Sequence, residues 1–433
     1  MRVNKVNLVN YRCFKDLSFE LHDSFTVLVG NNGSGKSTIL DGIALGLASF
    51  FVGMEGDSPK GIDKSDVRLE TYEIGSRLEK QAQYPAQIHC DGVLASTDVK
   101  WSRSKNTETG TTTYGDAAPL TLITKQLVGD IKKGDTSVVL PILAYYTTAR
   151  LWGKKREKKE TTKVDLNSRF TGYLDCLDSM NNEKLMRKWL EQMTYIELQR
   201  GEPVPELTAV KKAILACFNA SGNIEEMGKA EKCSFDVKSG EIEIVYVLPD
   251  GKKQIHALSE MSDGYRNMLS LVADIAYRMA LLNPQLLDRV TEETSGIVLI
   301  DEIDLHLHPA WQRHIVNALK EIFPKVQFIV STHAPSVISS VPKEEIIVLE
   351  NHQARKADFP TYGRDVNSIL KTIMDVPERP DKIAKKLEEF YRYLSEGDYD
   401  VAKRILNDVK CILGEDDPTI VDAETSLDLE TMV

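Results

Sequence analysis

The chain has 433 residues, of which 42% are hydrophobic and 27% are charged, and its formal net charge is −11. This length allows two or three domains, and the acidic balance argues against a protein whose whole surface binds nucleic acid. We expect no membrane span, because no apolar run reaches about 18 residues. The six cysteines form no CxxC pair, which argues against a zinc site or a disulfide framework and fits a reducing cytoplasm.

The first third of the sequence predicts a strand, a glycine turn and a helix. Residues 3–14 alternate between apolar and polar side chains, and 25–30 form an apolar run that ends in glycine, so we expect two strands. Apolar residues recur at helical spacing over 36–51, which completes the layout of a βα unit. Residues 52–75 are rich in Gly, Asp, Ser and Lys and predict an irregular excursion, whereas 85–125 is strand-like.

The remainder predicts the second half of an α/β sheet, separated from the first half by helices. We expect a buried strand within 138–150 and, after a basic segment, a helical insert over roughly 165–230. The pattern beyond the insert predicts a hairpin at 233–248, helices at about 262–282 and 309–322, and strands at 296–300, 326–331 and 345–350. Residues 380–412 predict an amphipathic helical tail, and the acidic residues after it predict a frayed end.

A glycine-rich segment near the N-terminus has the sequence of a phosphate-binding loop. It follows a predicted strand, precedes a predicted helix and satisfies G-x-x-x-x-G-K-[ST]. In this setting backbone N–H groups converge on a β-phosphate, Lys36 supplies a charge to the β- and γ-phosphates, and Ser37 is a Mg²⁺ ligand. The alternative is a glycine-rich turn with no ligand. The expected nucleotide-binding residues are Gly30, Asn31, Asn32, Gly33, Ser34, Gly35, Lys36, Ser37 and Thr38.

Two adjacent carboxylates, Asp301 and Glu302, directly follow the apolar segment 297–300. Ligands of open α/β sheets bind at the carboxyl ends of the strands. We therefore expect Asp301 to hold Mg²⁺ through water and Glu302 to act as the general base on the attacking water. The alternative is an acidic pair that caps the next helix, but this does not explain why both acids follow so apolar a strand.

Two further segments separate one class of P-loop protein from the others. Ser262, Asp263 and Gly264 precede a long predicted helix, where a serine and a glycine can bind a γ-phosphate. The same tripeptide is also an ordinary helix cap. His333 ends the apolar segment 327–333 and is a candidate catalytic γ-phosphate sensor or water positioner. A structural histidine is the alternative.

Taken in order, these motifs resemble those of ABC-type ATPases of the SMC and RecF kind. The N-terminal NYRCF belongs to the same pattern. The segments LPILAYYTTARLW, SDGYRNMLSLVADIAYRMA, IVLIDEIDLHLHPAWQ, QFIVSTHAP and YGRDVNSIL are similar to a shorter bacterial family of AAA-type ATPases. That family includes the ATPase subunit of Septu-type anti-phage systems. The resemblance covers the catalytic lobes well and the two inserts, 52–135 and 165–230, only loosely.

The resemblance implies an α/β fold of the ABC-ATPase head type. Its P-loop α/β core would carry an N-terminal antiparallel β-subdomain, a mostly helical insert and a C-terminal helical tail. The implied domains are an N-terminal lobe with the P-loop at 1–160, the helical insert at 161–232, a C-terminal lobe at 233–350 and the helical tail at 351–433.

The resemblance also implies a site that two protomers share. ATP and Mg²⁺ would lie on the P-loop of one protomer and be closed by Ser262 and Gly264 of another, so that ATP would hold a homo-oligomer together. Arg12 matches the arginine of the family's N-terminal segment, which lies near the nucleotide. Residues 304–309 would form the D-loop, and 145–150 would stand where a Q-loop is expected, although no glutamine is identifiable.

The implied function is that of an ATP-hydrolysing subunit that regulates a separate HNH nuclease in anti-phage defence. Nucleic acid would be contacted through that complex, because nothing in this chain resembles a nuclease centre. A stand-alone DNA-repair or DNA-tethering ATPase is the alternative, with the basic segment 154–163 on DNA phosphates or simply a solvated loop. A transporter subunit is a third possibility, which the long polar inserts argue against. A transition-metal cluster around His306 and His308 competes with the ATPase roles of the nearby acids.

Overall fold

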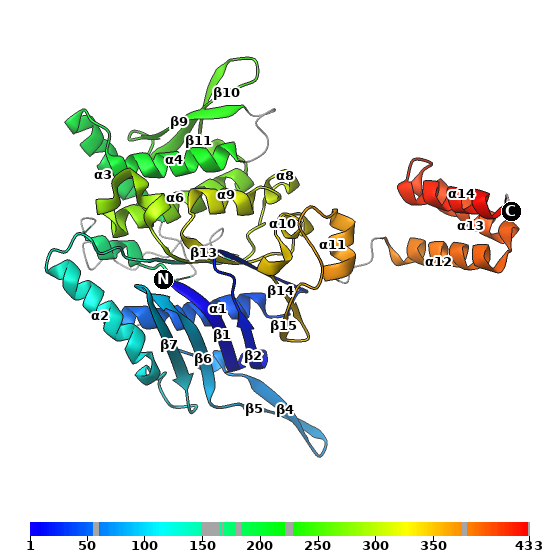
Figure 1. Cartoon of the computed structure of the whole chain (residues 1–433), viewed down its shortest axis with the longest axis horizontal. Coiled ribbons are helices and arrows are strands. Elements are labelled where there is room, and N and C mark those ends of the chain that lie inside the picture. The colour runs from blue at the N-terminus through cyan, green and yellow to red at the C-terminus, as the bar shows by residue number, and fades with distance from the viewer. Residues whose placement is uncertain are drawn as a thin grey trace. The chain divides into compact units, whose positions relative to one another are not determined.

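The computed structural model describes residues 1–54, 60–148, 165, 168–178, 183–220, 228–374 and 379–431. It contains two compact units, Met1–Arg364 and Asp365–Val433 (Figure 1). The basic segment 154–163 and the end of the expected Q-loop, 149–150, lie outside the described residues.

A six-stranded sheet in the order β15-β14-β3-β13-β12-β8 forms the centre of the first unit. All neighbouring strands are parallel except β14 and β15. The four inner strands and β8 are apolar and almost entirely buried, as expected for a parallel sheet covered on both faces. The strands are β3 (Phe25–Gly30), β8 (Ile142–Tyr146), β12 (Gly296–Ile300), β13 (Val326–Ser331), β14 (Ile346–Glu350) and β15 (Gln353–Lys356).

Helix α1 (Lys36–Leu47) lies between the central sheet and a four-stranded antiparallel sheet (Figure 1). The antiparallel sheet has the order β2-β1-β6-β7. Its strands are β1 (Arg2–Tyr11), β2 (Phe14–Glu20), β6 (Ala86–Leu94) and β7 (Thr97–Lys105), and an exposed hairpin of β4 (Leu69–Ile74) and β5 (Arg77–Ala82) precedes β6. Among the described residues, Lys36–Gly53 alone is a helix long and apolar enough to cross a membrane, but 72% of it is buried. This position identifies it as a core helix.

A helical layer covers the other face of the central sheet. The longest of its helices, α6 (Asp263–Leu282), contacts β8 and packs against α4. A three-stranded sheet in the order β11-β10-β9 lies on α4. The remaining elements of the first unit are α2 (Ala118–Lys132), α3 (Glu183–Arg200), α4 (Pro205–Asn219), α7 (Val290–Glu293), α8 (Pro309–Gln312), α9 (Ile315–Ile322), α10 (Pro335–Ile338), β9 (Lys229–Asp236), β10 (Glu241–Val247) and β11 (Lys253–Ala257).

The second unit is helical and has its own hydrophobic core. It consists of α11 (Val366–Ile373), α12 (Asp381–Glu396), α13 (Tyr399–Leu413) and α14 (Pro418–Thr431). Helix α13 contacts both α12 and α14. The core is built from apolar residues at helical spacing on these three helices, including Leu387, Phe390, Leu406, Val409 and Ile420. Each helix therefore buries one stripe and exposes the rest.

The predicted α/β fold class is confirmed, but several predicted elements were wrong in detail. The first strand is a hairpin, because Arg12 adopts a left-handed conformation (φ 47°) and turns β1 into β2. The strand-like segment 85–125 contains two strands and then the start of α2, which has Pro119 in its first turn. The predicted helix 309–322 is interrupted between α8 and α9.

The prediction of a frayed acidic end was also wrong. Residues 418–431 form α14, in which Ile420, Ala423 and Leu427 are buried against the neighbouring helices. Three apolar residues among many acids give a weak sequence signal, and packing onto α13 supplies the stability that helix propensity does not.

Candidate nucleotide-binding site

Three neighbouring parallel strands end at one edge of the central sheet and carry the predicted site. The segment 30–38 follows β3, Ser331 and His333 lie at the end of β13, and Asp301 and Glu302 follow β12. Parallel pairing of β12 with β13 and of β13 with β3 holds these ends in register. The sheet thus brings together residues that lie about 300 positions apart in the chain.

The P-loop turns from β3 into α1 through Gly35, the residue before the helix. Its φ of 103° lies in the left-handed region that favours glycine, and a Cβ there would overlap the ring of Phe14. Lys36 is buried, and its Nζ donates to the carbonyl oxygens of Gly30 at 2.8 Å and Asn31 at 3.1 Å. The ammonium group is therefore held over the loop that precedes it.

The residues of this loop fit an anionic phosphate chain. The Ser34 Oγ is buried and has no hydrogen-bond partner among the described residues, so it is available to a ligand. Asn31, Asn32, Gly33 and Ser37 are exposed. The N-terminus of α1, with its unpaired N–H groups and positive dipole end, faces the same loop.

Hydrogen bonds between strand ends hold the Asp301 carboxylate and the backbone of Glu302. The Ser331 hydroxyl donates to the Asp301 carboxylate at 2.5 Å and accepts from the Glu302 amide at 2.8 Å. Glu302 has a φ of 50°, an unusual conformation for a residue with a side chain. Thr332 donates in the same way to Asp304 at 2.5 Å. Neighbouring residues of β13 therefore hold the acids that follow β12.

Lys36 and His333 are close enough to these acids to interact with them electrostatically. Burial lowers the pKa of Lys36, and the carboxylates of Asp301, Glu302 and Asp304 oppose this shift. Burial, and then the positive charge of Lys36, lower the pKa of His333 against the same three carboxylates. The lysine and the acids thus form one charged cluster, and the histidine lies within its electrostatic reach.

The predicted signature residues lie at the N-terminus of α6. Ser262 is the N-cap residue but makes no side-chain cap hydrogen bond, and both Ser262 and Asp263 are exposed. The buried Gly264 lies so close to the His306 carbonyl that a Cβ would overlap it. The signature segment therefore packs against the predicted D-loop of the same chain and leaves its serine accessible.

Arg12 is beside α1 but engages carboxylates instead of the P-loop. Its guanidinium donates to Asp41 at 2.5 Å and to Asp66 at 2.8 and 2.9 Å. Asp41 also accepts from the Tyr145 hydroxyl at 2.9 Å. Arg12 thus connects the turn after β1 to the helix that carries the P-loop lysine.

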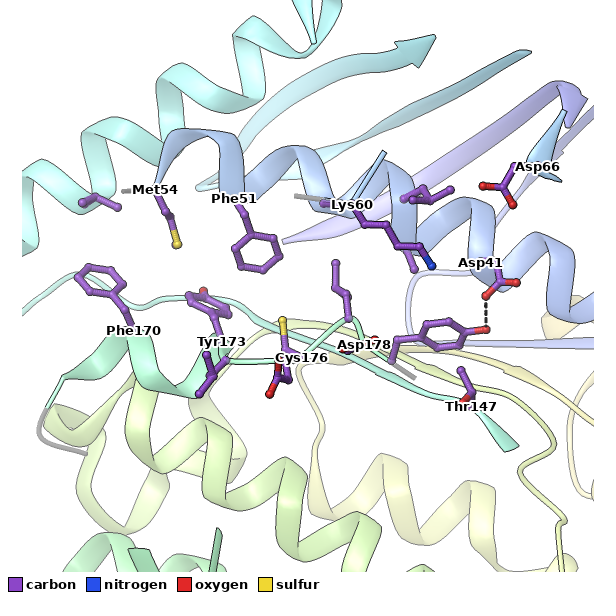
Figure 2. A pocket seen from close by; sticks show the side chains of 18 of the residues that line it. Asp41, Phe51, Met54, Lys60, Asp66, Thr147, Phe170, Tyr173, Cys176 and Asp178 are labelled. Atoms are coloured by element: carbon purple, nitrogen blue, oxygen red, sulfur yellow. Dashed lines mark hydrogen bonds between the residues drawn. The ribbon is translucent and has the colours of Figure 1, made fainter. Parts of the chain in front are cut away.

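A cavity of about 620 Å³ opens next to this network (Figure 2). Its described lining is aromatic and apolar at one end, with Phe51, Met54, Phe170 and Tyr173, and polar at the other, with Arg12, Asp41, Asp66 and Tyr145. None of the residues 30–38 belongs to this lining. The cavity is therefore distinct from the P-loop surface, although both border α1.

The structure gives no support for a metal cluster around His306 and His308. Within the described part of the chain, no three His, Cys, Asp or Glu residues gather as metal ligands. His308 instead caps α8, where its Nδ1 accepts from the Ala310 amide at 3.3 Å.

The residues that support this site from neighbouring elements were not predicted from the sequence. Ser331 and Thr332 stand within the segment QFIVSTHAP but were assigned no role, and Asp41 was not singled out. Tyr145 was noted only as the first residue of the segment expected in place of a Q-loop. Their partners lie between 28 and 104 residues away in the sequence. Only the polar Ser-Thr pair at the end of an apolar strand was a usable signal.

Comparison with known proteins places these motifs in a family. The family model described as "AAA domain, putative AbiEii toxin, Type IV TA system" matches residues 25–339. This range contains the P-loop, the signature segment, both carboxylates and His333.

Individual relatives match over very different lengths. The Escherichia coli protein named "Retron Ec83 probable ATPase" is 27% identical, over 100% of this chain and 87% of its own length. "Septu protein PtuA" of Bacillus thuringiensis is 28% identical, over 44% of this chain and 49% of its own length. Among solved structures, an SMC head bound to the C-winged helix domain of ScpA is 17% identical, with a TM-score of 0.46, over 83% of this chain and 98% of that chain.

Proposed function

Because the chain belongs to this AAA-domain family and is an ATPase of the ABC and SMC type, we propose that it binds and hydrolyses ATP in sites shared between protomers. The observation that carries the proposal is the charged cluster at one edge of the parallel sheet. There Lys36, His333 and the carboxylates that follow β12 lie within electrostatic reach of one another.

Each residue of the cluster has a role in this proposal. Residues 30–38 bind the phosphate chain through the loop amides, with Lys36 on the β- and γ-phosphates. Ser37 and Asp301 hold Mg²⁺, which when bound neutralises phosphate charge. Glu302 takes the proton from the attacking water, and His333 orients that water or the γ-phosphate.

The accessible Ser262 supports closure of the site by a second copy of the chain. Its hydroxyl is not used as a helix cap, and the adjacent N–H groups of α6 form a ready anion site. Asp263, beside it, pairs with Arg266 of the same helix. We infer that Ser262 and Gly264 contact the γ-phosphate held by the partner's P-loop, so that ATP links two heads.

The mass of the particle with and without ATP tests this proposal. Light scattering should show a larger particle with ATP and Mg²⁺, and Lys36→Ala should remove the change. Lys64→Ala is the matched control, because this lysine is exposed (65% of its side chain) and lies outside the cluster. A particle mass that does not respond to ATP, in a protein that binds it, would contradict a shared site.

We further propose that the ATPase regulates a separate HNH nuclease in anti-phage defence and that it acts in the cytoplasm. The support is the similarity to proteins named as Septu and retron components. Nucleic acid would be reached through the complex. Co-purification with an HNH protein encoded beside this gene, and ATP-sensitive DNA cleavage by the pair, are the expected results. DNA binding by the ATPase alone, falling steeply with salt, would favour the DNA-repair alternative instead.

A further inference from the structure

Two adjacent tyrosines, Tyr145 and Tyr146, end strand β8 and are both buried. Successive side chains of a strand point to opposite faces of the sheet. Tyr145 accordingly reaches the layer that contains α1, and Tyr146 reaches the layer that contains α6. These two helices carry the two halves of the proposed composite site.

The Tyr145 hydroxyl is bound to the P-loop helix. It donates to one oxygen of Asp41 at 2.9 Å (the dashed line that ends on Asp41 in Figure 2). The other oxygen of Asp41 accepts from Arg12 at 2.5 Å. Burial, and then the Asp41 carboxylate, raise the pKa of Tyr145, which keeps the hydroxyl protonated as a donor. Asp41 lies little more than one helical turn beyond Lys36.

The Tyr146 hydroxyl is bound to the signature helix. It donates to Asp274 at 2.7 Å, and Arg278 donates to the same carboxylate oxygen at 2.8 Å. Arg278 also donates to the carbonyls of Gly172 and Leu174, at 3.0 Å each. Asp274 and Arg278 are almost entirely buried, and their helix begins at the signature segment.

The backbone of Tyr146 is bound to the segment that carries the two carboxylates. The Tyr146 carbonyl accepts from the Asp301 amide at 2.8 Å, directly before Glu302. The end of β8 therefore contacts α1, α6 and the carboxylate segment within two residues.

Packing alone does not require hydroxyl groups at these positions. A phenylalanine would fill nearly the same space and need no partner, whereas each tyrosine places a donor on a carboxylate. The two carboxylates belong to the two helices that bear the P-loop and the signature segment.

We propose that Tyr145 and Tyr146 are positioning residues for the two halves of the composite site, the P-loop and the signature segment. The inference rests on the composite site proposed above. Tyr145 fixes α1 to the end of β8, and Tyr146 fixes α6 to it. Each protomer therefore presents its P-loop in an orientation that depends on Tyr145, and its signature segment in an orientation that depends on Tyr146.

Mixed dimers separate the two roles. One chain carries Lys36→Ala and supplies only a signature segment, and the other carries Ser262→Arg and supplies only a P-loop, so one composite site remains. Tyr146→Phe should lower the kcat for ATP about tenfold when placed in the signature-supplying chain, with KM unchanged. It should have little effect in the P-loop-supplying chain. Tyr145→Phe should show the reverse pattern.

Tyr173→Phe is the matched control in both chains. Tyr173 is also buried, but its hydroxyl donates to the Pro141 carbonyl at 2.6 Å and not to a helix carboxylate. Its loss should leave kcat unchanged in either chain, and thermal melting should show how much stability each tyrosine variant loses. If Tyr145 or Tyr146 only stabilised the fold, its substitution would lower activity equally whichever chain carried it.

The outcomes distinguish this inference from the function on which it rests. If the mixed dimer without tyrosine substitutions neither forms nor hydrolyses ATP, the composite site itself is wrong. If that dimer is active and Tyr146→Phe acts equally from both chains, or only from the P-loop-supplying chain, then Tyr146 acts through Asp301 or through stability, and the proposed positioning is overturned. An active dimer that is indifferent to both tyrosine variants overturns it as well.

Discussion

Ser331 and Asp301 are joined by a hydrogen bond of 2.5 Å that crosses from β13 to the end of β12. The same hydroxyl accepts from the Glu302 amide, and Glu302 is held at a positive φ that costs conformational energy. One serine thus holds both the Asp301 carboxylate and the backbone of Glu302. In the proposed mechanism, this is the arrangement that separates the Mg²⁺ ligand from the general base.

Ser331→Ala should therefore impair hydrolysis much more than ATP binding. We expect kcat to fall about tenfold, because the loss of one hydrogen bond to a charged group frees Asp301 and Glu302 to reorient. The matched control is Ser340→Ala, since Ser340 is equally small and buried but donates to the Val337 carbonyl at 2.7 Å. Steady-state ATPase assays with a separate nucleotide-binding titration make the measurement. An equal loss of activity in both variants would contradict the role given to Ser331.

Glu302→Gln should retain ATP binding and lose turnover. Glutamine cannot accept the proton of the attacking water, and general-base loss typically costs about 10²–10⁴-fold in rate. Asp301 and Ser37 remain, so ATP should accumulate on the protein and hold the larger particle together. Single-turnover hydrolysis and light scattering report the two effects. Glu344→Gln, a substitution of an acid in the short helical turn before β14, is the control.

A variant that hydrolyses ATP like the wild type would show that Glu302 is not the base. Wild-type turnover with no ATP-dependent increase in mass would show instead that closure is not needed for hydrolysis. The two measurements therefore test the catalytic assignment and the shared site separately.

The sequence predicts those parts of the structure that are marked by a motif of consecutive residues. The P-loop 30–38 and the pair Asp301 and Glu302 each occupy consecutive positions beside an apolar strand, so the fold class and the sheet edge could be predicted correctly. Their catalytic roles remain predictions.

The contacts that orient the site have no such signal. Tyr146 and Asp274 are separated by 128 residues, and Ser331 and Asp301 by 30. Each pair depends on which strands and helices become neighbours, and a single sequence does not fix that order. Helix α14 was missed for a related reason, because its stability comes from packing on α13 and its sequence is dominated by acids.

Asp274→Asn should destabilise the first unit substantially. The substitution leaves the buried Arg278 without a counter-charge, and breaking a buried pair by removing one partner costs about 3–5 kcal/mol. Asp358→Asn is the matched control, because its ion pair with Arg355 is largely exposed and such pairs contribute about 0–1 kcal/mol. Urea unfolding followed by tryptophan fluorescence measures both. Equal stabilities of the two variants would mean that water reaches Arg278.

Phe390→Ala should unfold the second unit selectively. Phe390 is fully buried in the core shared by α12, α13 and α14, and removal of such a side chain costs about 3–5 kcal/mol. That loss is comparable to the whole stability expected of so small a core. Hydrogen exchange should accelerate across 381–431 while the amides of β3, β12 and β13 keep their protection. Ile412→Ala, at an exposed position of α13 (61%), should change neither region. If Phe390→Ala also accelerated exchange in the central sheet, the two units would unfold together and could not be treated as independent in stability.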